Sequence, residues 1–173
     1  NDNKLLIAGT YGTLSSSTNL VSWNSEKQGL PLPLKKVDTQ DGKTVAIGSK
    51  HSLVIHGLLS DTTPSIAEPG FRQLSDIVGH QGKWAATGFG GEIATSPDGI
   101  NWNIGHVESS EHRTLFAQNG KWNAIGSSYG IATSNDGVNW SLGQNTGQTL
   151  HGIHANESGE WVAVGGYKNH GQI

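Results

Sequence analysis

The sequence contains no cysteine among its 173 residues, which excludes a disulfide framework and any metal site built on thiolates. Only 14% of the residues are charged and the formal net charge is −3, so the chain lacks the positive excess that attracts proteins to nucleic acids. The longest cationic run, Lys35-Lys36, is typical of a solvated strand end. No apolar run approaches the roughly 20 residues that cross a bilayer. We therefore expect no nucleic-acid partner and no membrane span.

Methionine is also missing, and the chain begins Asn1-Asp2-Asn3. This start leads us to expect a polypeptide that has been processed or excised from a larger precursor. Many exported bacterial domains have no cysteine, and we expect a secreted, periplasmic or cell-surface location.

Glycine and tryptophan, by contrast, are abundant, with 25 and six residues. This mixture indicates many short strands joined by tight turns, and no stretch shows sustained helical periodicity. The length suits one domain with a substantial core.

An internal repeat organises the chain. A Gly-Lys-Trp signature, or a variant of it, recurs at intervals of 39, 40, 38 and 39 residues. A period this even indicates one supersecondary unit used several times. The copies are Asn3-Lys4-Leu5, Gly42-Lys43-Thr44, Gly82-Lys83-Trp84, Gly120-Lys121-Trp122 and Gly159-Glu160-Trp161.

Each full copy contains four extended segments separated by glycine turns. In the third copy they are 73–78, 83–87, 92–96 and 101–104. Four such strands make one antiparallel sheet, and a repeated sheet of this kind is typical of a β-propeller blade. A β-solenoid is the main competitor, but its coils are usually shorter and its strands pair in parallel.

The sequence therefore predicts an all-β fold, a β-propeller of four-stranded antiparallel blades with about 39 residues per repeat. It has roughly five blades or is a fragment of a larger propeller, and it forms a single domain, 1–173. The repeats are 1–33 (partial), 34–71, 72–109, 110–147 and 148–173 (partial). Open blade edges would also permit self-association.

A second motif lies between the third and fourth segments of two copies. Residues 93–102 match residues 131–140 at an offset of 38, with two differences, and both contain Ser-x-Asp-Gly-x-Asn-Trp, here called the Asp turn. Residues 14–23 are a decayed copy, with Ser17, Asn19 and Trp23 in the places of Ser, Asp and Trp. The residues of the two full copies are Ser96, Asp98, Gly99 and Trp102, and Ser134, Asp136, Gly137 and Trp140.

The Asp turn resembles the Asp-box, or bacterial neuraminidase repeat, of sialidase-like and assembly-factor-like propellers, whose pattern is Ser-x-Asp-x-Gly-x-Thr-Trp. This chain is one residue shorter in the motif. The resemblance spans nearly the whole chain and implies that the turns are structural and lie away from an active face. A short carboxylate that accepts hydrogen bonds from turn amides suits this structural role. The alternative is that the aspartates bind a metal ion or act in catalysis.

Catalytic candidates are few. A sialidase of the resembled family would need three arginines on the substrate carboxylate, and this chain has only Arg72 and Arg113. Glu108 and Glu111 lie in one charged loop without the spacing of a glycosidase pair. His151 and His154 are three apart on a predicted strand, so they point to opposite faces. We expect no catalytic residue, no metal site and no cofactor.

Aromatic residues recur in the turn between the second and third segments. They are Tyr11, Phe89, Tyr129 and Tyr167, and all three tyrosines of the chain lie there. In a propeller these turns share a face with the connections between blades, so the rings would surround the central opening. Such a rim suits a carbohydrate or a side chain of a protein partner, and packing against the neighbouring blade is the alternative.

Trp84, Trp122 and Trp161 recur in the second segment, each followed by small residues, and we expect them to pack between blades. The sequence as a whole favours a non-catalytic recognition module that binds a carbohydrate or protein on the aromatic face. A scaffold or assembly factor and part of a glycoside hydrolase are the alternatives.

Overall fold

The computed structural model describes residues 4–27, 33–48, 54–56, 65–67, 73–107, 111–127, 131–143, 147–156 and 158–166. These residues form antiparallel strands and two short 3-10 turns, so the predicted all-β class is confirmed. Within the same ranges, no helix is both long and apolar enough to cross a membrane.

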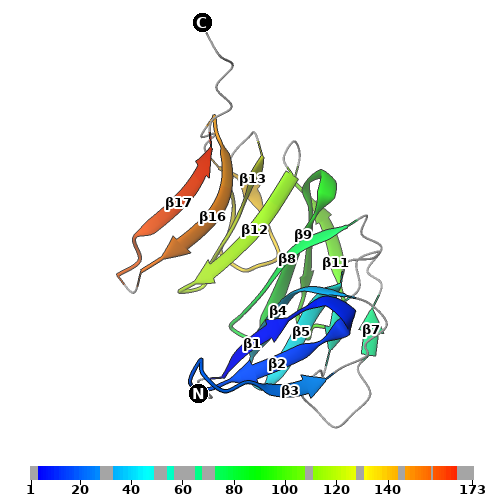
Figure 1. Cartoon of the computed structure of the whole chain (residues 1–173). Helices are drawn as coiled ribbons and strands as arrows, with labels where there is room; N and C mark the ends of the chain where they lie inside the picture. The colour runs from blue at the N-terminus through cyan, green and yellow to red at the C-terminus, as the bar shows by residue number, and fades with distance from the viewer. Residues whose placement is uncertain are drawn as a thin grey trace, which may run out of the picture.

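The described strands make five sheets, which follow one another in chain order (Figure 1). Sheet A holds β1 (Leu5–Ala8), β2 (Leu14–Ser17) and β3 (Asn24–Lys27). Sheet B holds β4 (Leu34–Gln40), β5 (Lys43–Gly48), β6 (Val54–His56) and β7 (Ser65–Ala67).

Sheet C is the best match to the four predicted segments. It holds β8 (Leu74–His80), β9 (Lys83–Gly88), β10 (Glu92–Ser96) and β11 (Asn103–His106), and β11 begins two residues later than predicted. Sheet D holds β12 (Glu111–Gln118), β13 (Lys121–Ser127), β14 (Ala132–Ser134) and β15 (Ser141–Leu142). Sheet E holds β16 (Thr149–Ala155) and β17 (Trp161–Gly166).

The first two strands of sheets B, C and D are joined by turns with two residues at positive φ. These pairs are Asp41-Gly42, Gln81-Gly82 and Asn119-Gly120, with φ between 50° and 76°. Two consecutive residues at positive φ define the type I′ hairpin, whose twist matches that of paired strands. The glycine of the repeat signature is therefore a conformational requirement of the turn.

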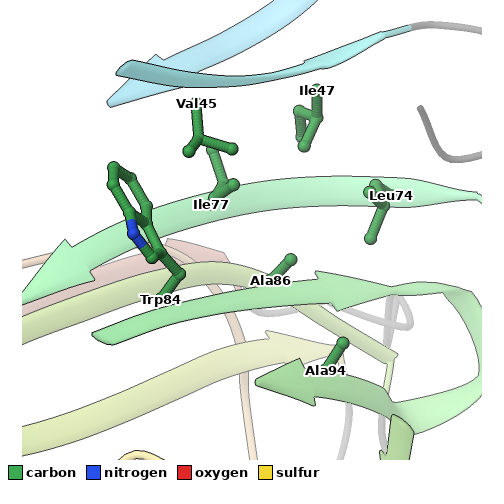
Figure 2. Close-up of a cluster of buried hydrophobic side chains, with 7 residues drawn as sticks. All are labelled: Val45, Ile47, Leu74, Ile77, Trp84, Ala86 and Ala94. Atoms are coloured by element: carbon green, nitrogen blue, oxygen red, sulfur yellow. The ribbon is translucent and has the colours of Figure 1, made fainter. Parts of the chain in front are cut away.

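Neighbouring sheets pack face to face through their first and second strands. The first strands β4, β8, β12 and β16 lie in succession, and each second strand also contacts the first strand of the next sheet. Figure 2 shows one junction, where Val45 and Ile47 of sheet B meet Ile77 and Trp84 of sheet C. All four side chains are at most 3% exposed, so the core consists of the junctions between sheets.

The predicted packing of tryptophan between sheets is confirmed for Trp84 and Trp122, which are 1% and 2% exposed. Each ring faces the preceding sheet, and Trp122 packs with Ala85 and Ile93 of sheet C. Burying an indole of roughly 200 Å² contributes on the order of 5 kcal/mol. Trp161 is 37% exposed and meets the preceding sheet edge to face at Phe116, with ring centroids 5.0 Å apart.

A β-bulge recurs in every first strand of sheets B to E. The ladder register shifts between Leu34 and Lys36, Leu74 and Asp76, His112 and Thr114, and Leu150 and Gly152. A bulge turns the following side chain away from its regular position in the pleat. At the three junctions from B to E, the residue after the bulge reaches the next sheet.

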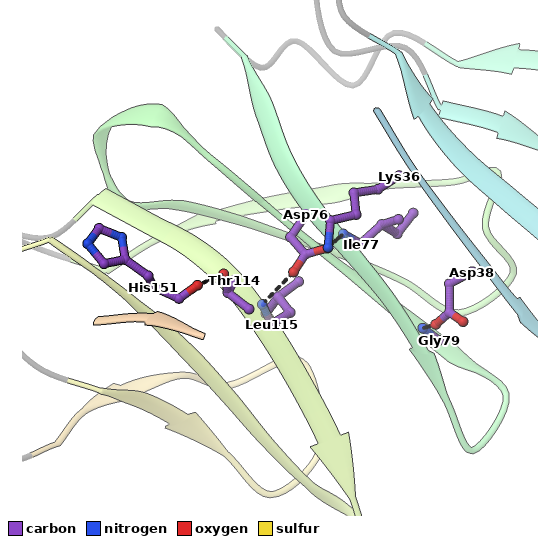
Figure 3. Close-up of polar contacts among 8 residues, drawn as sticks. All are labelled: Lys36, Asp38, Asp76, Ile77, Gly79, Thr114, Leu115 and His151. Carbon is purple, nitrogen blue, oxygen red and sulfur yellow. Dashed lines mark hydrogen bonds and ion pairs between the residues drawn. The ribbon is translucent and has the colours of Figure 1, made fainter. Parts of the chain in front are cut away.

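Figure 3 shows these bridges. Lys36 Nζ lies 3.4 Å from Asp76 Oδ1, and Asp76 Oδ2 accepts a 3.0 Å hydrogen bond from the Leu115 backbone N–H. Thr114 Oγ1 donates to the His151 carbonyl over 3.2 Å. Asp38, further along β4, accepts a 2.7 Å bond from the Gly79 N–H. Side chains of the first strands thus join sheets B, C, D and E in series.

Asp76 is the central member of this series, because it is 4% exposed and also accepts the Ile77 N–H. We expect Asp76→Ala to destabilise the fold by about 2 kcal/mol at neutral pH, since two buried N–H groups lose their acceptor. Urea denaturation followed by circular dichroism measures the change. Asp41→Asn removes one carboxylate from an exposed turn and should cost less than about 0.5 kcal/mol. Equal effects of the two substitutions would contradict the bridging role.

The same variant tests the pH dependence. Burial raises the pKa of Asp76, and the Leu115 N–H and the charge of Lys36 only partly offset it. The folded chain therefore holds this proton more tightly than the unfolded chain, whose aspartates titrate near about 4. The stability due to the protonated carboxyl is present below that value and is lost as the pH rises through the folded pKa. We expect the difference in unfolding free energy between the unaltered chain and Asp76→Ala to shrink from pH ~4 to pH ~7. If the unfolding free energies of the two proteins changed in parallel with pH, the raised pKa of Asp76 would be contradicted.

Candidate partner-binding face

Two of the predicted aromatic residues lie in the turns η1 (Thr10–Gly12) and η2 (Phe89–Gly91), which link the second and third positions of sheets A and C. Tyr11 is 83% exposed and Phe89 is 44% exposed. Tyr129 and Tyr167 lie outside the described residues. The structure therefore places two of the four predicted rings, and both are accessible to a ligand.

The two rings do not occupy equivalent positions in their turns. Phe89 is the first residue of η2, whereas Tyr11 is the second residue of η1 and has φ of 58°. The residue equivalent to Tyr11 in η2 is Gly90, with φ of 81°. A non-glycine residue in this region is uncommon, and η1 holds it with a 3.0 Å bond from the Gly9 N–H to the Thr13 carbonyl.

Both turns lie beside the first strand of the next sheet. The η1 turn packs against β4, where the Leu34 N–H donates to the Gly9 carbonyl over 3.1 Å, and η2 packs against β12. The rings thus lie at the end of the sheets where the first strands begin. Since backbone bonds fix both turns, the rings stand on a preorganised surface, which lowers the entropy lost on binding.

The Asp turns occupy the opposite end of the sheets. In residues 96–102, Asp98 Oδ1 accepts the backbone N–H groups of Ile100 and Asn101, both at 2.8 Å, and Oδ2 accepts the Asn101 side-chain amide at 2.7 Å. The Ser96 hydroxyl donates to Asp98 and accepts the Gly99 N–H at 2.8 Å. Residues 134–140 repeat every one of these bonds around Asp136.

The decayed copy in sheet A keeps the same plan. Asn19 Oδ1 accepts the N–H groups of Val21 and Ser22, both at 2.9 Å, and Ser17 Oγ accepts the Leu20 N–H. Leu20 has φ of 62°, where the full copies have glycine at 82° and 73°. A side-chain amide and a strained leucine therefore support the turn that a carboxylate and a glycine support elsewhere.

Each full Asp turn has one further hydrogen bond, the first within its own residues and the second from the neighbouring sheet. Trp102 Nε1 donates to the Gly99 carbonyl over 3.1 Å, and Lys83 Nζ of sheet C donates to the Asp136 carbonyl of sheet D over 2.9 Å. A Cβ atom on Gly137 would lie 2.9 Å from the Trp122 ring, so this glycine provides both positive φ and close packing.

Hydrogen bonding decides the charge state of these aspartates. Burial raises the pKa of Asp98, but the N–H groups of Asn101 and Ile100 and the side chains of Asn101 and Ser96 outweigh it, so the pKa lies far below its ordinary value. The N–H groups of Asn139 and Val138 lower the pKa of Asp136 in the same way. The stability linked to these carboxylates is present above pH ~4 and is lost as the pH falls through the folded pKa values.

Both carboxylates are thus occupied by their own turns, and the described residues contain no cluster of three side chains suited to a metal ion. Two hollows lie between sheets. One of about 320 Å³ lies between sheets D and E and is lined by Trp122, Ile131, Thr133, Ile153 and Trp161. One of about 190 Å³ lies between sheets C and D beside His106 and Trp140.

No family model and no curated protein matches this chain. Solved structures do. The chain is similar to the structure "YCF48 bound to D1 peptide", with 17% identity, a TM-score of 0.67, and 95% of this chain aligned to 57% of that chain. The structure "Crystal structure of Nidogen/Laminin Complex" gives 12% identity, a TM-score of 0.72, and coverage of 94% and 70%. These neighbours are β-propellers.

The fold is that of a β-propeller.

A third structure, "YCF48 from Cyanidioschyzon merolae", agrees with 15% identity, a TM-score of 0.66, and coverage of 94% and 63%. At these identities the likeness establishes the fold and nothing finer. The chain spans 57% of the length of the first of these structures.

The first sheet offers a natural control for the Asp turn. We expect Asp98→Asn to destabilise the fold by about 1 kcal/mol, because the new amide faces the Asn101 amide and two donors meet. Asn101→Ser in that background should recover part of the loss, since Asn19 and Ser22 coexist in sheet A. Asn101→Ser alone should cost stability. A double-mutant cycle by thermal denaturation checks this, and additive effects would contradict the pairing.

Proposed function

We propose that this chain is a non-catalytic recognition module that binds a segment of a protein partner on the face formed by η1 and η2. The observation that carries the proposal is the exposure of Tyr11 and Phe89 on turns held by backbone hydrogen bonds. Large rings of this kind dominate binding energy at protein interfaces. Two of the similar structures, YCF48 with a bound D1 peptide and a complex of nidogen with laminin, support a protein ligand.

We also propose the number and type of the blades. We take the five sheets as successive blades of about 39 residues, within an Asp-box type propeller of roughly five blades or an arc of a larger one. The predicted rings Tyr129 and Tyr167 would extend the aromatic rim. We also propose a secreted, periplasmic or cell-surface location, where the recognition face would be accessible to its partner.

A carbohydrate is the second ligand class, since an exposed ring among glycines also stacks on a sugar face. A peptide display library and a glycan array, each probed with the purified chain, separate the two. Selection of peptides supports the proposal, selection of glycans alone identifies a lectin, and silence in both overturns recognition on this face. Turnover of a fluorogenic glycoside would instead indicate part of a glycoside hydrolase, and stable co-purification of subunits would indicate an assembly factor.

The rings provide the decisive variants. Tyr11→Asn with Phe89→Ala removes both rings, and asparagine tolerates the positive φ at position 11. We expect affinity for a selected peptide to fall by about tenfold to a hundredfold, in line with the loss of interface aromatics. The melting temperature should move by less than about 2 °C, since both rings are exposed.

Val138→Ala is the matched control, because Val138 is 53% exposed at the opposite end of the sheets. It should leave the affinity unchanged. A large loss of stability in the ring variant would show that the rings pack against their neighbours, and an unchanged affinity would place the binding face elsewhere.

A further inference from the structure

In sheets B, C and D, the last residue of the first strand bonds to the turn that follows the first strand of the next sheet. At the end of β4, Gln40 Oε1 accepts the Gly82 N–H over 3.0 Å. At the end of β12, Gln118 Nε2 donates to the Asn156 carbonyl over 3.1 Å. The same position at the end of β8 is His80. One bridge of this series therefore depends on a residue type that titrates near neutral pH.

The hydrogen bond of His80 fixes the protonation state of its ring. Its Nε2 atom lies 3.0 Å from the backbone nitrogen of Gly120 in the hairpin of sheet D. A backbone N–H can only donate, so Nε2 has to carry a lone pair, and the ring is the neutral tautomer with its proton on Nδ1. The amide oxygen of Gln40 accepts at any ordinary pH, whereas an imidazole nitrogen accepts only while the ring is neutral.

This bond closes one end of the junction between sheets C and D, whose first strands β8 and β12 lie side by side (Figure 1). The His80 ring meets the Trp122 ring edge to face, with centroids 5.7 Å apart. Trp122 is 2% exposed and belongs to the buried cluster of the junction, on which Val78 also packs. His80 and Gly120 are half-buried, so the bond lies at the rim of the core, within reach of solvent protons.

We propose that His80 is a pH-sensitive latch between sheets C and D. Its neutral ring holds the hairpin of sheet D through the Gly120 N–H. When the ring takes up a proton, Nε2 becomes a donor that faces another donor, and the hairpin loses this attachment. The junctions from B to C and from D to E use glutamine at the same position, so the response is confined to one junction.

Two lysines and two aspartates carry the charges on the elements around the ring. Lys83 stands opposite His80 in its own hairpin, and its Nζ donates to the Asp136 carbonyl of sheet D. Lys121 of sheet D lines the hollow toward sheet E, and Asp38 of sheet B accepts the backbone N–H of the residue before His80. Among the residues that the structure describes, no ion pair includes His80. Its response is therefore set by burial and by the hydrogen bond.

The direction of the response follows from the linkage between protonation and folding. Burial lowers the pKa of His80, so the folded chain binds this proton less tightly than the unfolded chain, whose histidines titrate near about 6.5. The stability due to the neutral ring is present above that pH and is lost as the pH falls through the folded pKa. Mild acid thus weakens the junction between sheets C and D.

Hydrogen exchange of single backbone amides, measured by NMR from pH ~8 to pH ~5, tests the latch directly. We expect the protection of the Gly120 N–H to fall by about threefold to tenfold as the His80 ring titrates, which is the effect of one lost hydrogen bond. The Gly82 N–H is the internal control, because Gln40 accepts it in the same geometry without titrating. Its protection should not follow the His80 titration.

His80→Gln is the matched variant, since glutamine holds this position in sheets B and D. It should keep the Gly120 N–H protected across the whole pH range. Relative to this variant, the unfolding equilibrium constant of the unaltered chain should rise by about threefold to tenfold from pH ~7.5 to pH ~5. Buried carboxylates such as Asp38 titrate in both proteins, so their effects cancel in the comparison. His106→Gln, at an exposed residue of β11, removes an imidazole elsewhere and should leave the response intact.

Three results would overturn the latch. They are protection of the Gly120 N–H that stays constant while the His80 ring titrates, a loss of that protection that persists in His80→Gln, and a ring that remains neutral down to pH ~5. Where circular dichroism shows that His80→Gln is unfolded, the comparison of the Gly120 and Gly82 amides within the unaltered chain still decides between a titrating latch and a fixed contact.

Discussion

Everything in this structure depends on the contact between one sheet and the next. A single four-stranded sheet of this size cannot bury both of its faces, and the buried hydrophobic clusters of the described residues lie between sheets. The second strand carries this contact, because its alternate side chains are buried against the sheets on both sides. In β9, Trp84 faces the preceding sheet and Ala85 faces the next one, and both are buried.

The bulges add direction to that contact. Apolar packing alone would let two sheets slide, because dispersion and hydrophobic forces have little directionality. A side chain after each bulge bonds to a defined backbone group or side chain of the next sheet, as Asp76 does with the Leu115 N–H. The register between sheets is thus specified by hydrogen bonds while the energy comes chiefly from burial.

The parts of the fold that repeat as residue types could be predicted from the sequence. Each type I′ turn requires a glycine at positive φ, and each full Asp turn uses a serine and an aspartate to bind its backbone N–H groups. These residue types therefore recur and make the period visible in the sequence. The bulge bridges could not be predicted, because Lys36, Asp76 and Thr114 fill one structural position with a cation, an anion and a hydroxyl. The bulge geometry repeats, but the residue type at this position does not, so the sequence contains no motif that would predict the bridges.

The candidate site was predictable in outline for a similar reason. Aromatic residues cluster in one turn of the repeat, and the described rings are exposed there, but the offset of Tyr11 from Phe89 depends on backbone dihedrals. The two ends of the sheets differ in kind. The Asp turns have nearly identical bonds from copy to copy, whereas the aromatic turns vary, as expected where a rigid scaffold presents variable contacts.

The tight hairpins between first and second strands have a consequence for how the chain reaches this state. Because two residues join the pair in sheets B, C and D, large strand interfaces of these sheets form between segments adjacent in sequence, and hairpins of this kind form in microseconds. Local contacts speed folding, so we expect assembly to proceed sheet by sheet as the polypeptide leaves the ribosome, with each new hairpin docking on the one already made.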